Sequence, residues 1–139
     1  STDQGVITGK AAEVARLRAA LATPALVLAD VFVKHSVPPA GLTLERAAAD
    51  TWKRAGADGL IVTGTGTGRP ASLEDVARVK AATPGAPVLV GSGVTVETLA
   101  ATLRLADAVI VGTALKVDGV VTAPIDARRA RAFVAALSR

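Results

Sequence analysis

Continuous apolar segments alternate with amphipathic ones along the chain. Four of the apolar segments are short and lack alternating polar positions, which is typical of strands covered on both faces in a parallel sheet. The predicted strands are residues 25–33, 59–63, 87–90 and 107–111.

Segments with apolar residues at helical spacing lie before, between and after these strands. Thr43, Ser72, Thr95 and Asp126 are each suited to cap the start of a helix, and Asp75 would complete a capping box with Ser72. The order α-β-α-β-α-β-α-β-α indicates a parallel α/β fold. The expected buried faces are Val14, Leu17 and Leu21; Leu44, Ala47, Ala48, Thr51 and Ala55; Leu73, Val76 and Val79; Val96, Leu99 and Leu103; and Ala130, Phe133, Val134 and Leu137.

The number of predicted strands distinguishes between α/β architectures. A (β/α)8 barrel takes about 250 residues, and an open doubly wound sheet usually has about five strands. Four strands in a chain of 139 residues predict a single domain, residues 1–139, built as a half-barrel of parallel strands alternating with helices. Its first and last strands would be unpaired edges, so we expect a homodimer in which two halves close one barrel.

Composition excludes several classes of protein. Half of the residues are hydrophobic and 20% are charged, which excludes a disordered chain. No apolar run approaches the roughly 20 residues of a membrane-spanning helix. There is no cysteine and only one histidine, so we expect no metal and no cofactor. A cytoplasmic location is the simplest expectation.

The net charge of +4 raises the question of nucleic-acid binding. Binders of this kind usually gather basic residues into a stripe, often beside aromatic side chains that stack on bases. The three aromatic residues of this chain lie far apart, and the densest basic cluster is Arg128, Arg129 and Arg131 on the last predicted helix. We interpret that cluster as a solvated helix face and expect no nucleic-acid partner.

Glycine-rich turns follow the last two predicted strands. Gly91, Ser92 and Gly93 follow one strand, and Gly112 and Thr113 follow the next. Such turns present backbone N–H groups and hydroxyls at the carboxyl ends of strands, where barrel enzymes often hold phosphate. They predict a site for inorganic phosphate or a phosphorylated small molecule, the alternative being glycines that only make tight turns. The spacing fits neither a dinucleotide fingerprint nor a P-loop.

Further candidates for chemistry follow the first strand. Period-two alternation places Asp30 and Lys34 on one strand face, and His35 is the only histidine. All three are candidate catalytic residues, although Lys34 could be the structural partner of Asp30, and His35 an ordinary hydrogen-bonding residue. The candidates to cover the ligand from neighbouring loops are Thr63, Gly64 and Lys116.

Five segments together resemble the BtpA family, barrel proteins named for a role in photosystem I biogenesis. They are Asp3-Gln-Gly5, Ala29-Asp-Val-Phe-Val-Lys-His35, Val62-Thr-Gly-Thr-Gly-Thr-Gly68, Val90-Gly-Ser-Gly-Val-Thr95, and Val111-Gly-Thr-Ala-Leu-Lys116 with Asp118-Gly119. The resemblance implies that the chain is the second half of a TIM barrel, strands five to eight. The missing N-terminal half is then a second candidate partner. The resemblance implies a fold and an anion site more strongly than a reaction.

Three functions stay open at this point. The first is a barrel that binds a phosphorylated small molecule at the rim formed by the carboxyl ends of its strands, with an unknown reaction. The second is a non-enzymatic assembly or stability factor for a photosystem or another complex. The third is a self-associating half-barrel scaffold without activity of its own. Whether the chain is an enzyme is equally open.

Overall fold

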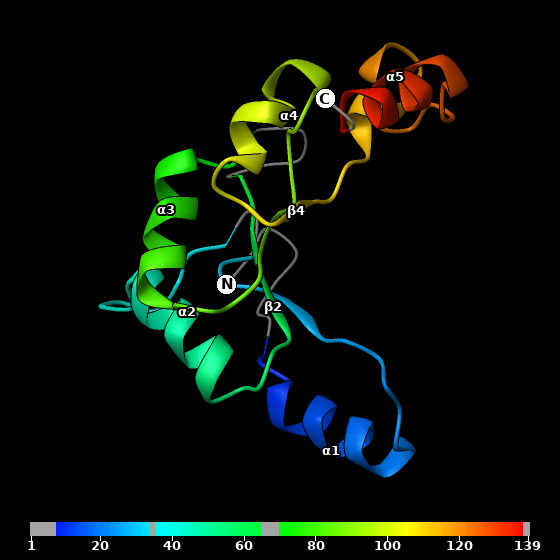
Figure 1. Ribbon diagram of the computed structural model, residues 1–139. Helices are drawn as coiled ribbons and strands as arrows, with labels where there is room; N and C mark the ends of the chain where they lie inside the picture. Colours follow the sequence, from blue (N-terminus) through cyan, green and yellow to red (C-terminus); the bar gives the residue numbers. More distant parts are fainter. Residues whose placement is uncertain (1–7, 34–35, 65–69, 138–139) are drawn as a thin grey trace.

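The structure is a computed structural model that describes residues 8–33, 36–64 and 70–137. Strands and helices alternate along the chain, which confirms the predicted α/β order (Figure 1). The elements are α1 Ala11–Leu21, β1 Leu28–Asp30, α2 Leu44–Lys53, β2 Gly59–Val62, α3 Leu73–Ala82, β3 Val88–Val90, α4 Val96–Leu103, β4 Ala108–Val109, the 3-10 helices η1 Thr113–Leu115 and η2 Val117–Gly119, and α5 Ala127–Leu137.

The four strands form one parallel sheet in the order β1-β2-β3-β4. Each strand pairs only with its neighbours in sequence, as consecutive strands of a barrel do. One register row joins Asp30 to Ile61, Leu89 and Ala108 across the whole sheet. The architecture is therefore a four-stranded α/β half-barrel.

One face of this sheet carries the core. Leu60 and Val62 of β2 and Val88 and Val90 of β3 are each at most 4% exposed. They belong to one core cluster with buried residues of α2, α3 and α4, including Val76, which is fully buried. Figure 1 shows these three helices along one side of the strands. We call this side the helix face.

The opposite face of the sheet is open. Strand alternation and the register place Leu28, Ile61, Leu89 and Ile110 on it. Leu28 and Ile110 are each 44% exposed. We call this side the inward face, because it corresponds to the interior of a closed barrel. The expectation that both faces of the strands are covered is wrong for the residues that the structure describes.

The helix starts follow the sequence closely. The hydroxyls of Thr43, Ser72 and Thr95 each accept a backbone N–H three residues later, and the Asp126 carboxylate accepts those of the two following arginines. The predicted capping box at Ser72 is only half present, because the Asp75 carboxylate binds Arg78 instead. The reciprocal pair of bonds occurs at the start of α4.

The end helices expose the faces that the sequence predicted to be buried. No residue of α1 is buried, and Leu17 and Leu21 are 60% and 64% exposed. An ion pair of 2.7 Å between Arg18 and Asp58 ties α1 to the start of β2. Helix α5 buries Phe133, but Val134 is 63% exposed. Four further residues that were predicted to be buried are exposed: Val14, Leu73, Val96 and Leu137.

Candidate functional site

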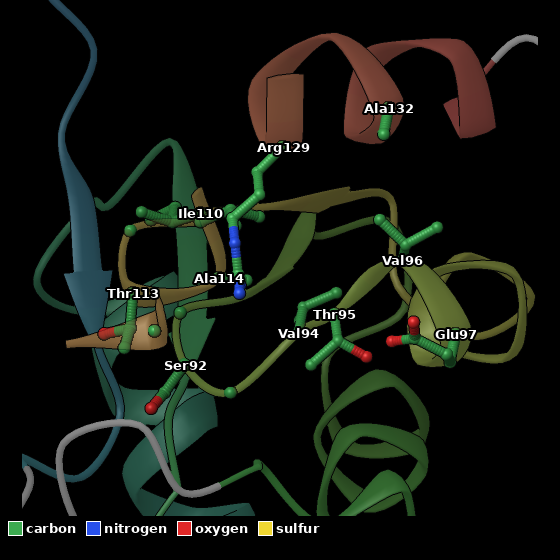
Figure 2. Close-up of a pocket in the computed structure, with 15 residues that line it drawn as sticks. Ser92, Val94, Thr95, Val96, Glu97, Ile110, Thr113, Ala114, Arg129 and Ala132 are labelled. Carbon is green, nitrogen blue, oxygen red and sulfur yellow. The ribbon is translucent and has the colours of Figure 1, made fainter. Parts of the chain in front are cut away.

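A cavity of about 690 Å³ opens at the carboxyl ends of β3 and β4. Its walls are the turn after β3 with the first turn of α4, the turn after β4, and one side of α5 (Figure 2). The residues predicted to hold phosphate all line it: Gly91, Ser92, Gly93, Gly112 and Thr113. The two turns that are about 20 residues apart in sequence thus face one space, as expected for neighbouring parallel strands.

The three glycines of the two turns differ in whether the protein itself requires glycine there. Gly93 has a φ of +69°, a conformation that side chains other than glycine rarely adopt. A Cβ on Gly91 would lie 2.6 Å from the Ile61 Cγ2 atom, so packing on the inward face requires glycine there. Gly112 differs, because its φ is −127° and no atom lies within 4 Å of the position a Cβ would take. Neither a left-handed backbone nor packing accounts for glycine at position 112.

Hydroxyl groups add donors to the same walls. Ser92 is 6% exposed, and Thr113 opens the 3-10 helix η1. The first turn of α4, with its cap Thr95, lines the cavity as well. Backbone and hydroxyl donors concentrated in this way suit an anion.

Two charged residues of the cavity were not singled out from the sequence. Arg129 comes from the first turn of α5, and Figure 2 shows its side chain reaching from that helix into the space above Ala114. Glu97 comes from the first turn of α4. A hydrogen bond from the Thr95 side chain and another from the backbone of Glu97 lower the pKa of the Glu97 carboxyl. It is therefore ionised at neutral pH.

The sequence did carry a signal for Arg129. We interpreted Arg129 as part of a solvated cluster with Arg128 and Arg131. A helix that is capped by Asp126 soon after the Gly112 turn places its first turn near the rim of the sheet, and Arg129 lies three residues after that cap. Helix spacing then separates Arg129 from its two basic neighbours.

The other predicted site residues lie elsewhere. Asp30 is exposed at the carboxyl end of β1 and belongs to the inward face, whereas Lys34 and His35 lie outside the described residues. Thr63 and Gly64 line a separate cavity of about 220 Å³ after β2. The Thr63 hydroxyl donates a hydrogen bond to the Phe32 carbonyl at 3.3 Å.

Lys116 lies in the connection between β4 and α5, where its Nζ donates a hydrogen bond to the Val121 carbonyl. It does not line the cavity after β3 and β4. The five predicted phosphate-binding residues therefore share one cavity. The other candidates that the structure describes do not line it: Asp30, Thr63, Gly64 and Lys116.

The described residues contain neither a cluster of metal ligands nor a membrane-spanning helix. Within residues 8–33, 36–64 and 70–137, no three histidine, aspartate or glutamate side chains are grouped so that they could hold a metal ion. In the same ranges no helix combines the length and the apolar character needed to cross a membrane.

The whole sequence matches a known protein family. A family model described as BtpA family matches residues 1–139. The photosystem I biogenesis protein BtpA of Synechocystis sp. is 40% identical over 138 residues, which are 99% of this chain and 48% of that protein. An uncharacterized protein of Thermococcus kodakarensis is 43% identical over 133 residues, and one of Pyrococcus furiosus is 42% identical over 133 residues, each alignment covering 96% of this chain and 50% of the relative. The chain spans about half the length of the curated relatives it matches.

Proposed function

The chain belongs to the BtpA family, and from this premise we propose that it binds inorganic phosphate or a phosphorylated small molecule in the cavity after β3 and β4. The observation that carries the proposal is the open backbone of Gly112. A glycine that neither its φ nor its packing requires leaves space for a ligand to approach the main chain. Phosphate is the ligand whose oxygens suit a wall of amides and hydroxyls.

The neighbours of Gly112 support the same ligand. Ser92 and Thr113 bring one hydroxyl each, and Gly91 and Gly93 bring main-chain N–H groups to the other side of the cavity. The resemblance to the second half of a barrel supports the same proposal, because barrel enzymes often hold phosphate after their last two strands. The reaction that the bound molecule undergoes is not part of the proposal.

Titration calorimetry tests the proposal. The particle size is first measured by sedimentation, and inorganic phosphate and glucose 6-phosphate are then titrated into that sample. We expect saturable binding, weakened by the Ser92→Ala change. Thr122→Ala serves as a matched control, because Thr122 is an exposed residue outside the cavity. The absence of binding heat with both probes would contradict the proposal.

A catalytic role for Asp30, Lys34 and His35 is a separate part of the proposal. Asp30 lies on the inward face two strands away from β3. In a curved sheet the inward sides of the strands face a common axis, so a bound molecule longer than phosphate could reach Asp30. The test is whether Asp30→Asn leaves binding of glucose 6-phosphate unchanged while it abolishes any turnover found for the assembled protein.

The name of the Synechocystis relative favours a second function, an assembly or stability factor. That protein is named for photosystem I biogenesis. On this proposal the chain would bind a protein complex without converting a small molecule. A pull-down from cells that carry the protein distinguishes the two functions. Capture that survives both Ser92→Ala and Lys34→Ala supports the assembly role, and capture that each change abolishes supports a ligand-dependent role.

The partner that we propose for the inward face is a second (β/α)4 unit of the kind that the relatives carry in their unmatched half. The inward face and the apolar sides of α1 and α5 are exposed together. The relatives extend beyond the match by about as many residues as the match itself contains. Four further strands would cover the inward face and pair with β1 and β4, the two edges of the sheet.

Co-expression of the chain with the unmatched half of the Pyrococcus furiosus relative tests this partner. Recovery of a one-to-one complex supports it. A homodimer of the chain alone, with no complex in the mixture, would show that a second copy occupies the inward face instead. A cytoplasmic location is also part of the proposed function, and cell fractionation tests it.

A further inference from the structure

Arg129 is placed to bind an anion in the cavity. Its backbone N–H is held by the Asp126 carboxylate at 3.3 Å, which fixes the start of the side chain. Its Nε lies 4.0 Å from the same carboxylate, and no other described residue bonds its guanidinium. The side chain is 41% exposed and lines the cavity.

Two other arginines of the chain form short ion pairs with carboxylates. Arg18 lies 2.7 Å from the Asp58 carboxylate, and Arg78 lies 2.7 Å from that of Glu45. Their charges are balanced at short range by the protein itself. At Arg129 the forked donor group is turned toward a space instead, and such a fork matches two oxygens of one phosphoryl group.

Glu97 places a negative charge in the same cavity, on the side of α4. Figure 2 shows Thr95 and Val94 between Glu97 and the end of the Arg129 side chain. No ion pair within 4.0 Å joins Arg129 to Glu97. The cavity is therefore positive on the side of α5 and negative on the side of α4.

The remaining walls are largely apolar and leave room for more than a phosphate ion. Val96, Ile110, Val111, Ala114 and Ala132 line them. A volume of about 690 Å³ lies within the range of about 300 to 1,000 Å³ that small-molecule sites occupy. A ligand that fills this space therefore extends beyond its phosphoryl group, and the extension contacts neither the glycine turns nor Arg129.

We propose that this cavity selects molecules with a single phosphoryl group and an uncharged, hydrogen-bonding remainder. Arg129 binds the phosphoryl oxygens together with the turn at Gly112. The Glu97 carboxylate accepts hydrogen bonds from the remainder and repels a second anionic group, so bisphosphates and polyphosphates bind poorly. The inference rests on the proposed phosphate binding and adds the charge of the preferred ligand to it.

Calorimetry with three probes tests the inference: inorganic phosphate, glucose 6-phosphate and fructose 1,6-bisphosphate. We expect Arg129→Ala to weaken binding of glucose 6-phosphate by on the order of 10- to 100-fold, the usual effect of removing a charge-assisted pair of hydrogen bonds. Arg129→Lys should recover part of the loss through its charge alone. The matched control is Arg128→Ala, which removes a neighbouring arginine that lies outside the cavity.

The selectivity is tested at Glu97. We expect Glu97→Gln to strengthen binding of fructose 1,6-bisphosphate by about tenfold while binding of glucose 6-phosphate changes by less than about threefold. Glu74→Gln is the matched control, since Glu74 is an exposed glutamate in the first turn of α3. An unchanged preference between the two sugar phosphates in the Glu97→Gln variant would overturn the selectivity.

The outcomes separate this inference from the proposed function. If the unchanged protein binds none of the three probes, the proposed function is wrong. If it binds phosphate and Arg129→Ala binds equally well, the proposed function stands and the role of Arg129 is wrong. Circular dichroism and urea unfolding of each variant establish that it is folded. If Arg129→Ala is not folded, the binding affinity of Arg129→Lys is compared with that of the unchanged protein instead.

Discussion

Asp58 and Asp107 stabilise the sheet in the same way at two separate places. Asp58 donates its backbone N–H to the Val27 carbonyl at 2.8 Å, and its Oδ2 accepts the Val27 N–H at 2.7 Å. Asp107 makes the same two bonds with Val88, each at 2.8 Å. Each aspartate therefore joins the start of its own strand to the start of the preceding one, β1 with β2 and β3 with β4.

The equivalence extends to the helices. Asp58 also binds Arg18 of α1, the helix that precedes β1. Asp107 binds Lys80 of α3, the helix that precedes β3. The middle strand pair lacks such an aspartate in the described chain, since Ala86 and Pro87 precede β3 there. The half-barrel thus contains two similar helix–strand–helix–strand units.

These aspartates make stability depend on pH. The Val27 N–H and Arg18 lower the pKa of Asp58, and the Val88 N–H and Lys80 lower the pKa of Asp107. A carboxyl group with a lower pKa in the folded state adds stability above its unfolded pKa, and loses it as the pH falls through the folded pKa. We expect the free energy of unfolding to decrease as the pH falls below about 4.

Urea unfolding at about pH 7 and about pH 3 measures this effect. The double variant Asp58→Asn with Asp107→Asn should be less stable than the unchanged protein at the higher pH and should lose less stability on acidification. Asp118→Asn, at an exposed aspartate of η2, is the control. A double variant with the acid dependence of the unchanged protein would show that other carboxyl groups cause it.

Gly112→Ala should reduce phosphate binding without loss of stability. Apart from the neighbours of Gly112 in the chain, no atom of the described residues lies within 4 Å of the added methyl group, so the methyl group would meet the ligand. We expect binding of inorganic phosphate to weaken by at least about tenfold, since the main chain can no longer be approached closely. Gly9→Ala is the control, because Gly9 also has open space at its Cβ position and lies outside the cavity. Equal binding by both variants would contradict the approach of phosphate to Gly112.

Gly91→Ala should, in contrast to Gly112→Ala, destabilise the folded chain. Its methyl group would lie 2.6 Å from Ile61 Cγ2 and 2.9 Å from Thr63 Cγ2. Both atoms are methyl groups of β-branched side chains, whose χ1 rotation is restricted. Crowding of this kind costs about 1–3 kcal/mol. Urea unfolding measures the loss, and a stability equal to that of Gly112→Ala would show that the sheet yields at this point.

Leucines of the helix face and of α1 should differ in their contribution to stability. Leu99 is 1% exposed, so Leu99→Ala should cost about 2–5 kcal/mol in urea unfolding. Leu17 is 60% exposed, and Leu17→Ala should change the stability of the isolated chain by less than about 0.5 kcal/mol. The same Leu17→Ala change should weaken the complex with the unmatched half of a relative, which sedimentation measures. A large loss for Leu17→Ala in the isolated chain would show that α1 packs more tightly there.

Much of the fold could be predicted because local sequence determines it. A continuous apolar segment such as residues 59–63 forms β2 with one residue of error, since β2 has a neighbour on each side. The segment 25–33 pairs over only Leu28–Asp30, because β1 is an edge strand and pairs on one side alone. The length of each strand depends on how many strands pair with it, and the hydrophobic pattern of the sequence does not show that number.

Burial was predicted less well for the same reason. The spacing of Val14, Leu17 and Leu21 correctly gives a helix, but a pattern shows which side prefers burial and not whether anything covers it. The position of Arg129 depends on the connection between β4 and α5, which contains η1 and η2 and brings the start of α5 to the carboxyl ends of the strands. The Asp126 cap places Arg129 in the first turn of a helix, but no local pattern around the three arginines encodes the return of that helix to the rim. The glycines of the site could therefore be predicted directly, and its cation only through that cap.

Gly112 and Thr113 follow β4, which pairs over only two residues and has β3 as its one neighbour. The cavity wall that they form therefore belongs to the least supported strand of the sheet. A second unit that pairs with β4 would order this wall before any ligand arrives. Because such coupling is reciprocal, phosphate would in turn raise the affinity of the second unit by the same factor. Binding of the ligand and closure of the barrel would then each favour the other.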